Sequence, residues 1–341
     1  MSSTPFSRSE PGWLGDLFGA LPEGGQADLG GRAFVRRNDI LRELSLASDQ
    51  QEQTKSTFGF KWEKRDTFES EASLRRMKEW LIERYGDVPN AGWWKDHGDK
   101  PLVVDAGCGA GMSGLELFAP AVPRIRYLGV DISTAVDVAR DRFEKAGLDA
   151  GFMQADITDL PLPEGSVDVI FSEGVLHHTD STERALKSLA RRLKVGGRFL
   201  FYVYKTKGPI REFTDDYIRD KLEPIAPEQA WELMMPLTKL GQALGELNIE
   251  LTVPEEISLL EIPAGKINLQ RLFYWHVFKA FYREDLTLDE MNHINFDWYA
   301  PRNAARQTPE QVRQWCREAG LEIEREVVED AGITIQARRT A

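Results

Sequence analysis

A glycine-rich segment in the first half of the chain has the residue types of a nucleotide-binding turn. It reads Asp105-Ala106-Gly107-Cys108-Gly109-Ala110-Gly111, follows an apolar run and opens a predicted helix. Glycine at 107, 109 and 111 removes Cβ atoms that would collide with a nucleoside or an amino-acid group, and we expect free backbone amides at the helix start to bind a carboxylate. Asp105 would repel a pyrophosphate and attract an ammonium group. The segment therefore favours a methionine-derived cofactor.

Two further acids follow the next two predicted strands. Asp131 comes about 20 residues after the glycine turn, where a carboxylate can accept both hydroxyl groups of a ribose. Asp156 can accept a hydrogen bond from an adenine amino group while Ile157 covers the ring, and a solvated turn aspartate is the alternative. Because ligands bind at the carboxyl ends of the strands in open α/β sheets, we expect Asp105, Asp131 and Asp156 to line one site.

The glycines alone do not decide the class of cofactor. The dinucleotide pattern Gly-x-Gly-x-x-Gly fails when it is counted from Gly107, but it is met from Gly109 through Gly111 to Gly114. A nicotinamide-dependent oxidoreductase is therefore an alternative, although it leaves Asp105 facing a pyrophosphate. A non-catalytic scaffold or sensor is another, because a fold does not establish a reaction.

Alternating apolar runs and helical patterns must position these side chains. We expect strands at 102–104, 127–130, 151–154, 167–171 and 198–204, and helices at 134–146, 181–193 and 309–319. This alternation is typical of an α/β fold. We predict a Rossmann-like open, mostly parallel seven-stranded sheet with helices on both faces, an amino-terminal arm, and a helical insertion that acts as a lid.

The chain divides into four expected regions. Residues 1–95 form an amino-terminal arm and a cap helix, 96–204 the cofactor-binding core, 205–300 an inserted cap on the side of the second substrate, and 301–341 the completion of the sheet. Residues 1 to about 33 repeat Gly, Ser and Pro, which predicts a partly disordered arm. From Ser73, the expected N-cap, to Tyr85 the apolar spacing predicts an amphipathic helix.

Residues 101–204 resemble class I S-adenosylmethionine-dependent methyltransferases, especially the group similar to the ubiquinone and menaquinone methyltransferases. The resemblance rests on the glycine segment and on Gly129-Val130-Asp131-Ile132-Ser133, Ala155-Asp156, Val175-Leu176-His177-His178 and Lys194-Val195-Gly196-Gly197-Arg198. It implies S-adenosylmethionine as the cofactor, with the glycine loop at the methionine part, Asp131 at the ribose and Asp156 at the adenine. The expected cofactor-binding residues are Asp105, Gly107, Gly109, Gly111, Asp131, Ile132, Asp156, Ile157 and Glu173.

Two flanking segments resemble a bacterial subgroup that acts in glycan or specialised-metabolite pathways. They are Thr57-Phe58-Gly59-Phe60-Lys61-Trp62 and Asn295-Phe296-Asp297-Trp298-Tyr299-Ala300-Pro301-Arg302. Several members of that subgroup carry an amino-terminal zinc ribbon. No cysteine precedes Cys108 in this sequence, so we expect no metal.

Methyl transfer from a sulfonium is an in-line displacement, in which alignment alone can supply about 7 to 11 kcal/mol. His177 and His178 follow the fourth strand and are the candidate general bases, although packing or capping of the next helix is the alternative. The aromatic run 272–281 fits a buried helical stripe as well as a pocket wall. The residues expected beside the methyl acceptor are Phe58, Trp62, Trp298, Tyr299 and Arg302, the last three in a predicted loop.

The composition limits the classes of partner that we expect for this protein. The chain has 43 Lys plus Arg against 55 Asp plus Glu, a net charge of −12, which disfavours nucleic acid as a partner. Its two cysteines, Cys108 and Cys316, fit a reducing, cytoplasmic location, and no apolar run approaches the roughly 20 residues of a membrane span. We expect a small-molecule or glycan methyl acceptor, no nucleic acid and no membrane. Methylation at O, N, S or C and transfer of another group from the sulfonium all stay open.

Overall fold

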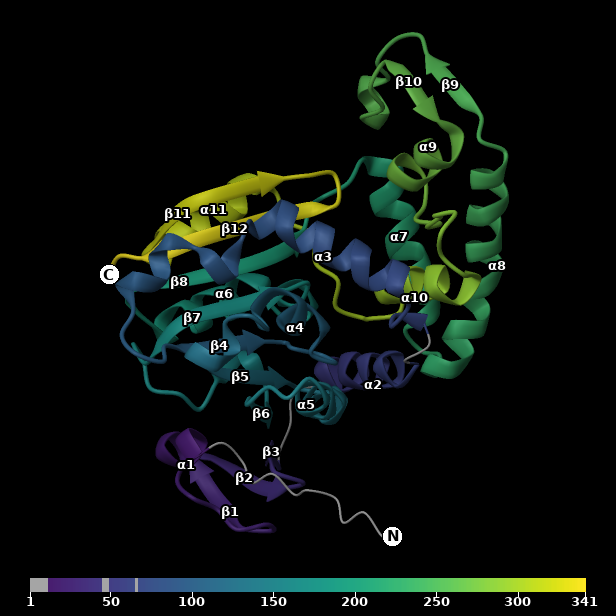
Figure 1. Cartoon of the computed structure of the whole chain (residues 1–341). Helices are drawn as coiled ribbons and strands as arrows, with labels where there is room; N and C mark the ends of the chain where they lie inside the picture. The colour runs from purple at the N-terminus through teal and green to yellow at the C-terminus, as the bar shows by residue number, and fades with distance from the viewer. Residues whose placement is uncertain (1–11, 45–48, 65–66) are drawn as a thin grey trace.

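The structure is a computed structural model that describes residues 12–44, 49–64 and 67–341. Ten strands form one sheet in the order β1-β2-β3-β6-β5-β4-β7-β8-β12-β11 (Figure 1). Its parallel centre consists of β6 (Gly151–Gln154), β5 (Arg126–Asp131), β4 (Leu102–Ala106), β7 (Val167–Glu173) and β8 (Leu193–Tyr204). The antiparallel strands β12 (Gly332–Arg339) and β11 (Leu321–Val328) follow β8. The predicted α/β, Rossmann-like, mostly parallel sheet is confirmed.

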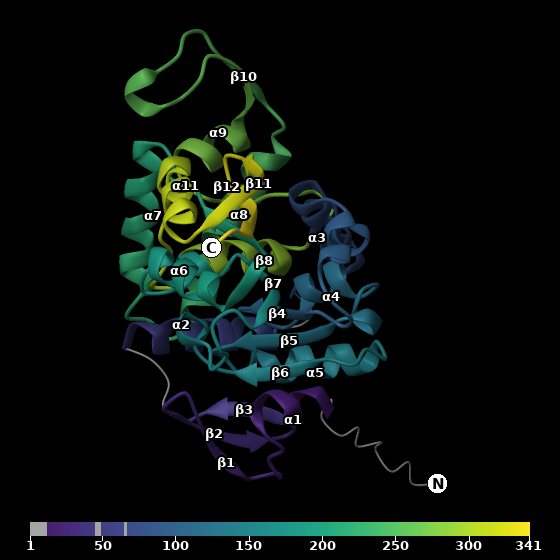
Figure 2. The ribbon, with the colours of Figure 1, turned by 90° about the vertical axis from the view of Figure 1, so that its left-hand side faces the viewer.

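The strand count of seven is wrong, because three amino-terminal strands extend the sheet. β1 (Gln26–Leu29), β2 (Arg32–Arg37) and β3 (Ile40–Glu43) form an antiparallel meander, and β3 pairs in parallel with β6 (Figure 2). These strands have only four to six residues each, and the apolar runs in them are at most three residues long, so the sequence pattern gives little strand signal.

The arm predicted to be partly disordered is ordered from residue 12 onward. Helix α1 (Gly12–Phe18) lies against the meander, and Leu14 is 2% exposed. Gly151 at the start of β6 accommodates Leu14, because a Cβ atom at 151 would lie 2.5 Å from its Cδ1 atom. The part of this prediction that concerns residues 1–11 lies outside the described residues.

Helices cover both faces of the sheet, and alternate residues of each strand face opposite cores. On one face, α3 (Glu71–Tyr85), α4 (Met112–Phe118) and α5 (Ala135–Lys145) pack over Val103 and Phe171. On the other face, α6 (Thr182–Arg192) and α11 (Pro309–Glu318) pack over Val104 and Ile170. Helix α3 begins two residues before its predicted cap, because the N-cap is Ser70, whose hydroxyl oxygen accepts a hydrogen bond from the Ser73 amide.

The insertion lies beyond the carboxyl ends of the parallel strands (green in Figure 1). It contains α7 (Pro209–Leu222), α8 (Pro227–Glu246), the hairpin of β9 (Glu250–Val253) and β10 (Gly265–Asn268), α9 (Leu269–His276) and α10 (Leu288–Tyr299). Helix α2 (Asp49–Glu63) contacts α5, α8 and α10, so it links the core to the insertion.

The helical stripe predicted over 272–281 ends early, at His276. Side chains of α10 bind the next backbone amides: the Lys279 amide donates to the Tyr299 hydroxyl at 2.7 Å, and the Phe281 amide donates to Asn295 Oδ1 at 2.9 Å. These bonds hold residues 277–283 along α10 in an irregular conformation, which the local sequence pattern does not indicate.

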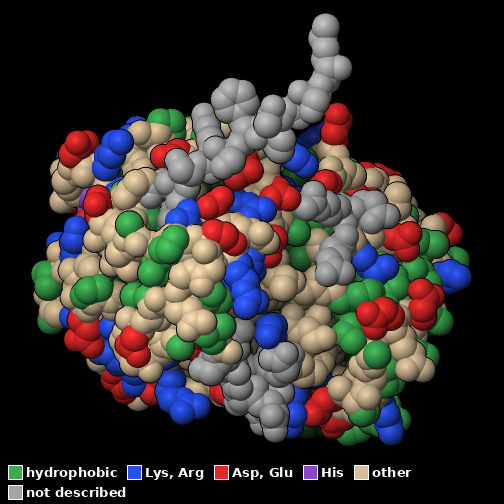
Figure 3. Space-filling model, turned by 90° about the horizontal axis from the view of Figure 1, so that it is seen from below, with side chains coloured by type: hydrophobic (Ala, Val, Ile, Leu, Met, Phe, Trp, Pro, Cys, Tyr) green, Lys and Arg blue, Asp and Glu red, His purple; other side chains and the backbone are tan. Residues whose placement is uncertain are grey.

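The described surface is mixed in charge on the face opposite the insertion hairpin. Figure 3 views the molecule from below and shows Lys and Arg side chains interspersed with Asp and Glu side chains. Within the described ranges, no helix has both the length and the apolar character that a membrane span requires.

Candidate active site

A cavity of about 540 Å³ lies at the carboxyl ends of the parallel strands, between the sheet, α2, α3 and the insertion. This volume is within the usual range for small-molecule sites. Most of the predicted cofactor residues line it, namely Asp105, Gly107, Gly109, Asp131, Ile132, Asp156, Ile157 and Glu173. Gly111 is the exception.

The three glycines of the turn have different surroundings. Gly107 has a φ of +87°, and a Cβ atom there would lie 2.3 Å from Val175 Cγ1, so only glycine fits. A Cβ atom at Gly109 would lie 3.0 Å from the Trp62 ring, which covers the turn. Gly111 is instead the N-cap of α4, where a Cβ atom would lie 2.9 Å from Ala139 Cβ on α5. Gly111 therefore allows two helices to pack closely.

The expectation of free amides in this turn is wrong at four positions. The Gly107 and Cys108 amides donate to the Val130 carbonyl, at 2.7 and 2.9 Å. The Gly109 amide donates to Asp131 Oδ2 at 2.9 Å, and the Gly111 amide donates to the Cys108 carbonyl. The turn uses these four donors to hold its own shape, which leaves the amides of the first residues of α4, Met112 and Ser113, for a carboxylate.

The Asp131 carboxylate is fixed by several donors at the end of β5. Besides the Gly109 amide, the Ser133 amide and hydroxyl donate to Oδ1, at 2.8 and 2.7 Å. Burial raises the pKa of Asp131, and these hydrogen bonds oppose the shift. The carboxylate is held rigidly, as recognition of a ribose diol requires.

Asp156 also lies at the cavity, after β6. Its Oδ1 accepts a hydrogen bond from the Thr158 amide at 2.8 Å and caps the short 3-10 helix η5 (Ile157–Asp159). Ile157 beside it is 5% exposed. Asp156 therefore has a structural role as the cap of η5, in addition to any contact with adenine.

Asp105 and Glu173 end the neighbouring strands β4 and β7. Asp105 accepts a hydrogen bond from the Tyr127 hydroxyl at 2.5 Å, and burial raises the pKa of its carboxyl to about 7. Glu173 forms an ion pair with Arg84 at 2.9 Å and accepts a hydrogen bond from the Tyr85 hydroxyl. Glu173 therefore holds Arg84 in the wall, whereas Asp105 is available to an ammonium group, which would lower the pKa of Asp105.

The two candidate bases differ in access. His178 lines the cavity, and its Nδ1 lies 2.5 Å from the Asn303 carbonyl oxygen, so Nδ1 carries the proton and Nε2 keeps a lone pair. Burial lowers the pKa of His178 to about 4, so the ring is neutral at pH 7. His177 is fully buried outside the cavity lining, with its ring centroid 3.6 Å from that of Tyr204. His177 is thus a packing residue.

The residues predicted beside the methyl acceptor also differ in whether they line the cavity. Phe58, Trp62 and Trp298 line the cavity, while Tyr299 and Arg302 do not. Trp298 and Tyr299 belong to α10, so the predicted loop is wrong at these positions. Tyr299 donates its hydroxyl to Asp215 at 2.9 Å, and Arg302 pairs with Glu223 at 3.0 Å.

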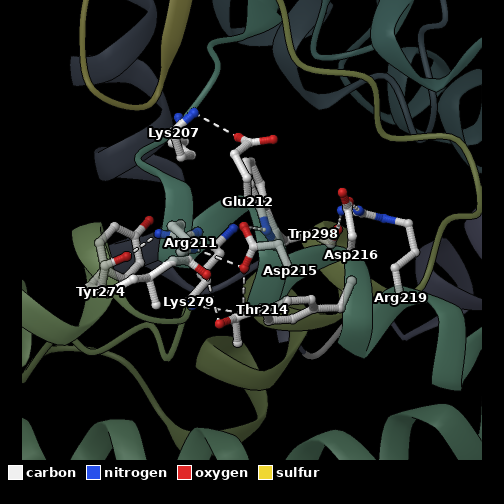
Figure 4. Close-up of polar contacts among 12 residues, drawn as sticks. Lys207, Arg211, Glu212, Thr214, Asp215, Asp216, Arg219, Tyr274, Lys279 and Trp298 are labelled. Carbon is white, nitrogen blue, oxygen red and sulfur yellow. Dashed lines mark hydrogen bonds and ion pairs between the residues drawn. The ribbon is translucent and has the colours of Figure 1, made fainter. Parts of the chain in front are cut away.

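The cavity also contains charged residues that the sequence reasoning missed. Lys61 and Asp297 form an ion pair between α2 and α10. Both lie inside the two flanking motifs, so the motifs were a usable signal for them. Arg211 pairs with Asp215 at 2.9 Å and donates to the Tyr274 carbonyl; Figure 4 shows this group beside Trp298 and Lys279. Nothing in the local sequence marks Lys279 or Arg76, which also line the cavity.

Comparison with known proteins identifies a methyltransferase domain in this chain. Residues 104–201 match a family model described as a methyltransferase domain. YcgJ of Bacillus subtilis, an uncharacterised methyltransferase, is 29% identical over 146 residues, which are 41% of this chain and 56% of that protein. The Mus musculus protein named "Probable tRNA methyltransferase 9B" is 34% identical over 116 residues, which are 33% of this chain and 24% of that protein.

Among solved structures, the 1,6-didemethyltoxoflavin-N1-methyltransferase of Burkholderia thailandensis aligns with a TM-score of 0.45 and 15% identity, over 93% of this chain and 99% of that one. The chain spans only a quarter to just over half of the length of the curated relatives. The residues matched by the family model, 104–201, include the glycine turn, Asp131 and Asp156. Residues 104–201 therefore form a methyltransferase domain, with S-adenosylmethionine as its cofactor.

Proposed function

We propose that this protein transfers the methyl group of S-adenosylmethionine to a small molecule held between the sheet and the insertion. The observation that carries this proposal is the shared cavity: Asp105, Asp131 and Asp156, from three adjacent strands, line it together with aromatic side chains of the insertion. The cofactor end and the aromatic end open into one space, so a donor and a methyl acceptor can meet there.

The residues present fit this cofactor. Asp131 would accept hydrogen bonds from the ribose hydroxyls, Asp156 and Ile157 would contact the adenine, and Asp105 would pair with the methionine ammonium group. The cofactor supplies a methyl group bound to a positively charged sulfur. The protein's main contribution is alignment, and the aromatic walls exclude water. The lone pair of His178 Nε2 would accept a hydrogen bond from the nucleophile and orient it, because a ring with so low a pKa is a weak base.

A small methyl acceptor fits the charge of the covering elements. The segment 205–300 has 10 Lys plus Arg against 17 Asp plus Glu, a net charge of −7. Such a lid repels the phosphates of a nucleic acid. The probable tRNA methyltransferase named above matches only 33% of this chain and 24% of its own length, so its substrate does not carry over to this protein.

Calorimetric titration with S-adenosylmethionine, S-adenosylhomocysteine and NAD tests the cofactor. We expect binding of both sulfur nucleosides with dissociation constants on the order of micromolar, and none of NAD. Incubation with methyl-tritiated S-adenosylmethionine and a cell extract, separated into RNA and small-molecule fractions, then tests the transfer. Label in the small-molecule fraction supports the proposal. Label confined to RNA, or binding of NAD alone, contradicts it.

A further inference from the structure

Two of the cations that line the cavity have no carboxylate partner among the described residues. These are Arg76 on α3 and Lys279, which lies between α9 and α10. The other lining cations are paired, in the ion pairs Lys61–Asp297, Arg84–Glu173, Arg211–Asp215 and Arg283–Asp285. One of these two cations comes from α3 and the other from the insertion.

Lys279 is buried and forms no ion pair with a described residue. It is 7% exposed, and its ammonium group lies 4.8 Å from the centroid of the Trp298 ring. The nearest carboxylates are already engaged: Asp297 by Lys61, and Asp215 by Arg211, by Trp298 Nε1 at 2.8 Å and by the Tyr299 hydroxyl. A buried charge without a partner is costly, so a bound anion would be strongly favoured here.

Arg76, on α3, contributes a second positive charge to the cavity lining. Its guanidinium group lies 5.2 Å from the centroid of the Phe281 ring, and no hydrogen bond from it to a described residue is present. Burial lowers the pKa of Lys279 to about 7, Asp297 opposes this shift, and Arg211 and Arg76 add to it. Phe281 is two residues after Lys279 in the same irregular segment, and both cations line the same cavity, so one bound anionic group can lie between them.

The wall around this pair is aromatic, with the side chains of Trp80, Tyr202, Tyr274, Trp275 and Trp298 in the lining. Arg84 is held between two of these rings, 4.1 Å from the centroid of Trp80 and 3.7 Å from that of Tyr202. Flat apolar surfaces bind a planar ring, and the two cations bind an anionic substituent on it.

We propose that the methyl acceptor is an aromatic oxyanion, a carboxylate or a phosphate, whose anionic group binds between Lys279 and Arg76. This inference rests on the proposed function, because it describes the second substrate of the same site. It assigns the specificity for that substrate to residues outside the cofactor-binding core.

Calorimetry on protein saturated with S-adenosylhomocysteine tests the proposal with benzoate, phenyl phosphate and the neutral benzamide. We expect at least one anion to bind about tenfold or more tightly than benzamide. The two anions distinguish a carboxylate site from a phosphate site. Equal binding of benzamide, or no binding of either anion at concentrations of about 10 mM, would overturn the proposal.

Substitutions test whether Lys279 and Arg76 cause the preference for anions. Lys279→Met and Arg76→Met should each lower anion affinity about tenfold and remove the preference over benzamide, while Lys279→Arg keeps it. Lys266→Met, which removes an exposed lysine of the hairpin paired with Glu250, is the control and should change nothing. Full anion preference in the first two variants would contradict the assignment.

Binding of S-adenosylhomocysteine to each variant separates this inference from the proposed function. We expect it to be unchanged in Lys279→Met and Arg76→Met. Its loss would mean that these cations hold the carboxylate of the cofactor, and the proposal would fall while the cofactor assignment stands. If the wild-type protein binds no S-adenosylhomocysteine but still prefers the anions, the proposed function fails and the anion site stands.

Discussion

Asp131 combines two tasks, because its carboxylate shapes the glycine turn through the Gly109 amide and faces the cavity. We predict that Asp131→Ala weakens binding of S-adenosylhomocysteine about tenfold or more, since it removes a charged acceptor worth roughly 1.5 to 3 kcal/mol. Calorimetry gives the affinity. Asp131→Asn, which removes the charge but keeps one oxygen acceptor, for either the Gly109 amide or the Ser133 donors, should lose less affinity than Asp131→Ala. Unchanged affinity in Asp131→Ala would show that the ribose binds elsewhere.

The pKa of Lys279, lowered to about 7 by burial, makes anion binding depend on pH. The ammonium group is charged below this pH and neutral above it, so we predict that benzoate affinity falls as the pH rises from about 6 to 8.5. Benzoate stays ionised throughout, because free carboxylic acids titrate near about 4. Of the neighbouring groups, Asp215 and Asp297 are held in ion pairs with Arg211 and Lys61. Burial also lowers the pKa of Lys207 to about 7, but Lys207 lies outside the cavity lining.

Lys279→Arg supplies the control, since an arginine keeps its charge over this whole range. Isothermal titrations at a series of pH values should therefore show a flat profile for Lys279→Arg and a falling one for the wild-type protein. A flat profile in both proteins would show that benzoate binding does not depend on the charge at position 279.

At the scale of elements, α1 is part of the core, although its sequence resembles a loose arm. Leu14 contacts Gly151 at the edge of the parallel strands and is 2% exposed. We predict that Leu14→Ala lowers the free energy of unfolding by about 2 to 5 kcal/mol, because it leaves a cavity in the core. Val195→Ala, at a residue 70% exposed, should change it by less than about 0.5 kcal/mol. Urea denaturation measures both, and equal small losses would mean that α1 does not contribute to the core.

The ion pair of Lys61 with Asp297 joins α2 to α10 across the cavity. Burial by itself would raise the pKa of Asp297, but the charge of Lys61 and its hydrogen bond hold it below the usual range. We predict that Lys61→Met costs up to about 3 kcal/mol, because it leaves a buried carboxylate unpaired. The double variant Lys61→Met with Asp297→Asn should lose less in urea denaturation. A larger loss in the double variant would show that the pair is not coupled.

At the scale of the whole molecule, the net charge of −12 and the acidic insertion bear on the class of methyl acceptor. We predict that tRNA does not bind with a dissociation constant tighter than about 10 μM at physiological salt, because too few phosphates can be neutralised. Filter binding of labelled tRNA checks this, with a basic tRNA-binding protein as the positive control. Micromolar or tighter binding would contradict the choice of a small molecule.

The sequence by itself determined the core and the cofactor. The turn from Gly107 to Gly111, the apolar strands and the acids at 131 and 156 follow local rules of turn chemistry, periodicity and strand-end position, and these rules operate within a few residues. Their predicted positions in the sheet agree with the structure. The family resemblance rests on the same local segments.

Only the tertiary structure decided which of these groups are free to act. Glu173 is engaged by Arg84, His177 is enclosed beside Tyr204, and the short strands of residues 26–43 are stabilised by pairing with β6. Arg76 and Lys279 are far apart in the sequence, and folding brings them to the same cavity, where neither forms an ion pair with a described residue. Pairing, burial and the absence of a counter-charge depend on contacts between distant segments, and no local pattern records them.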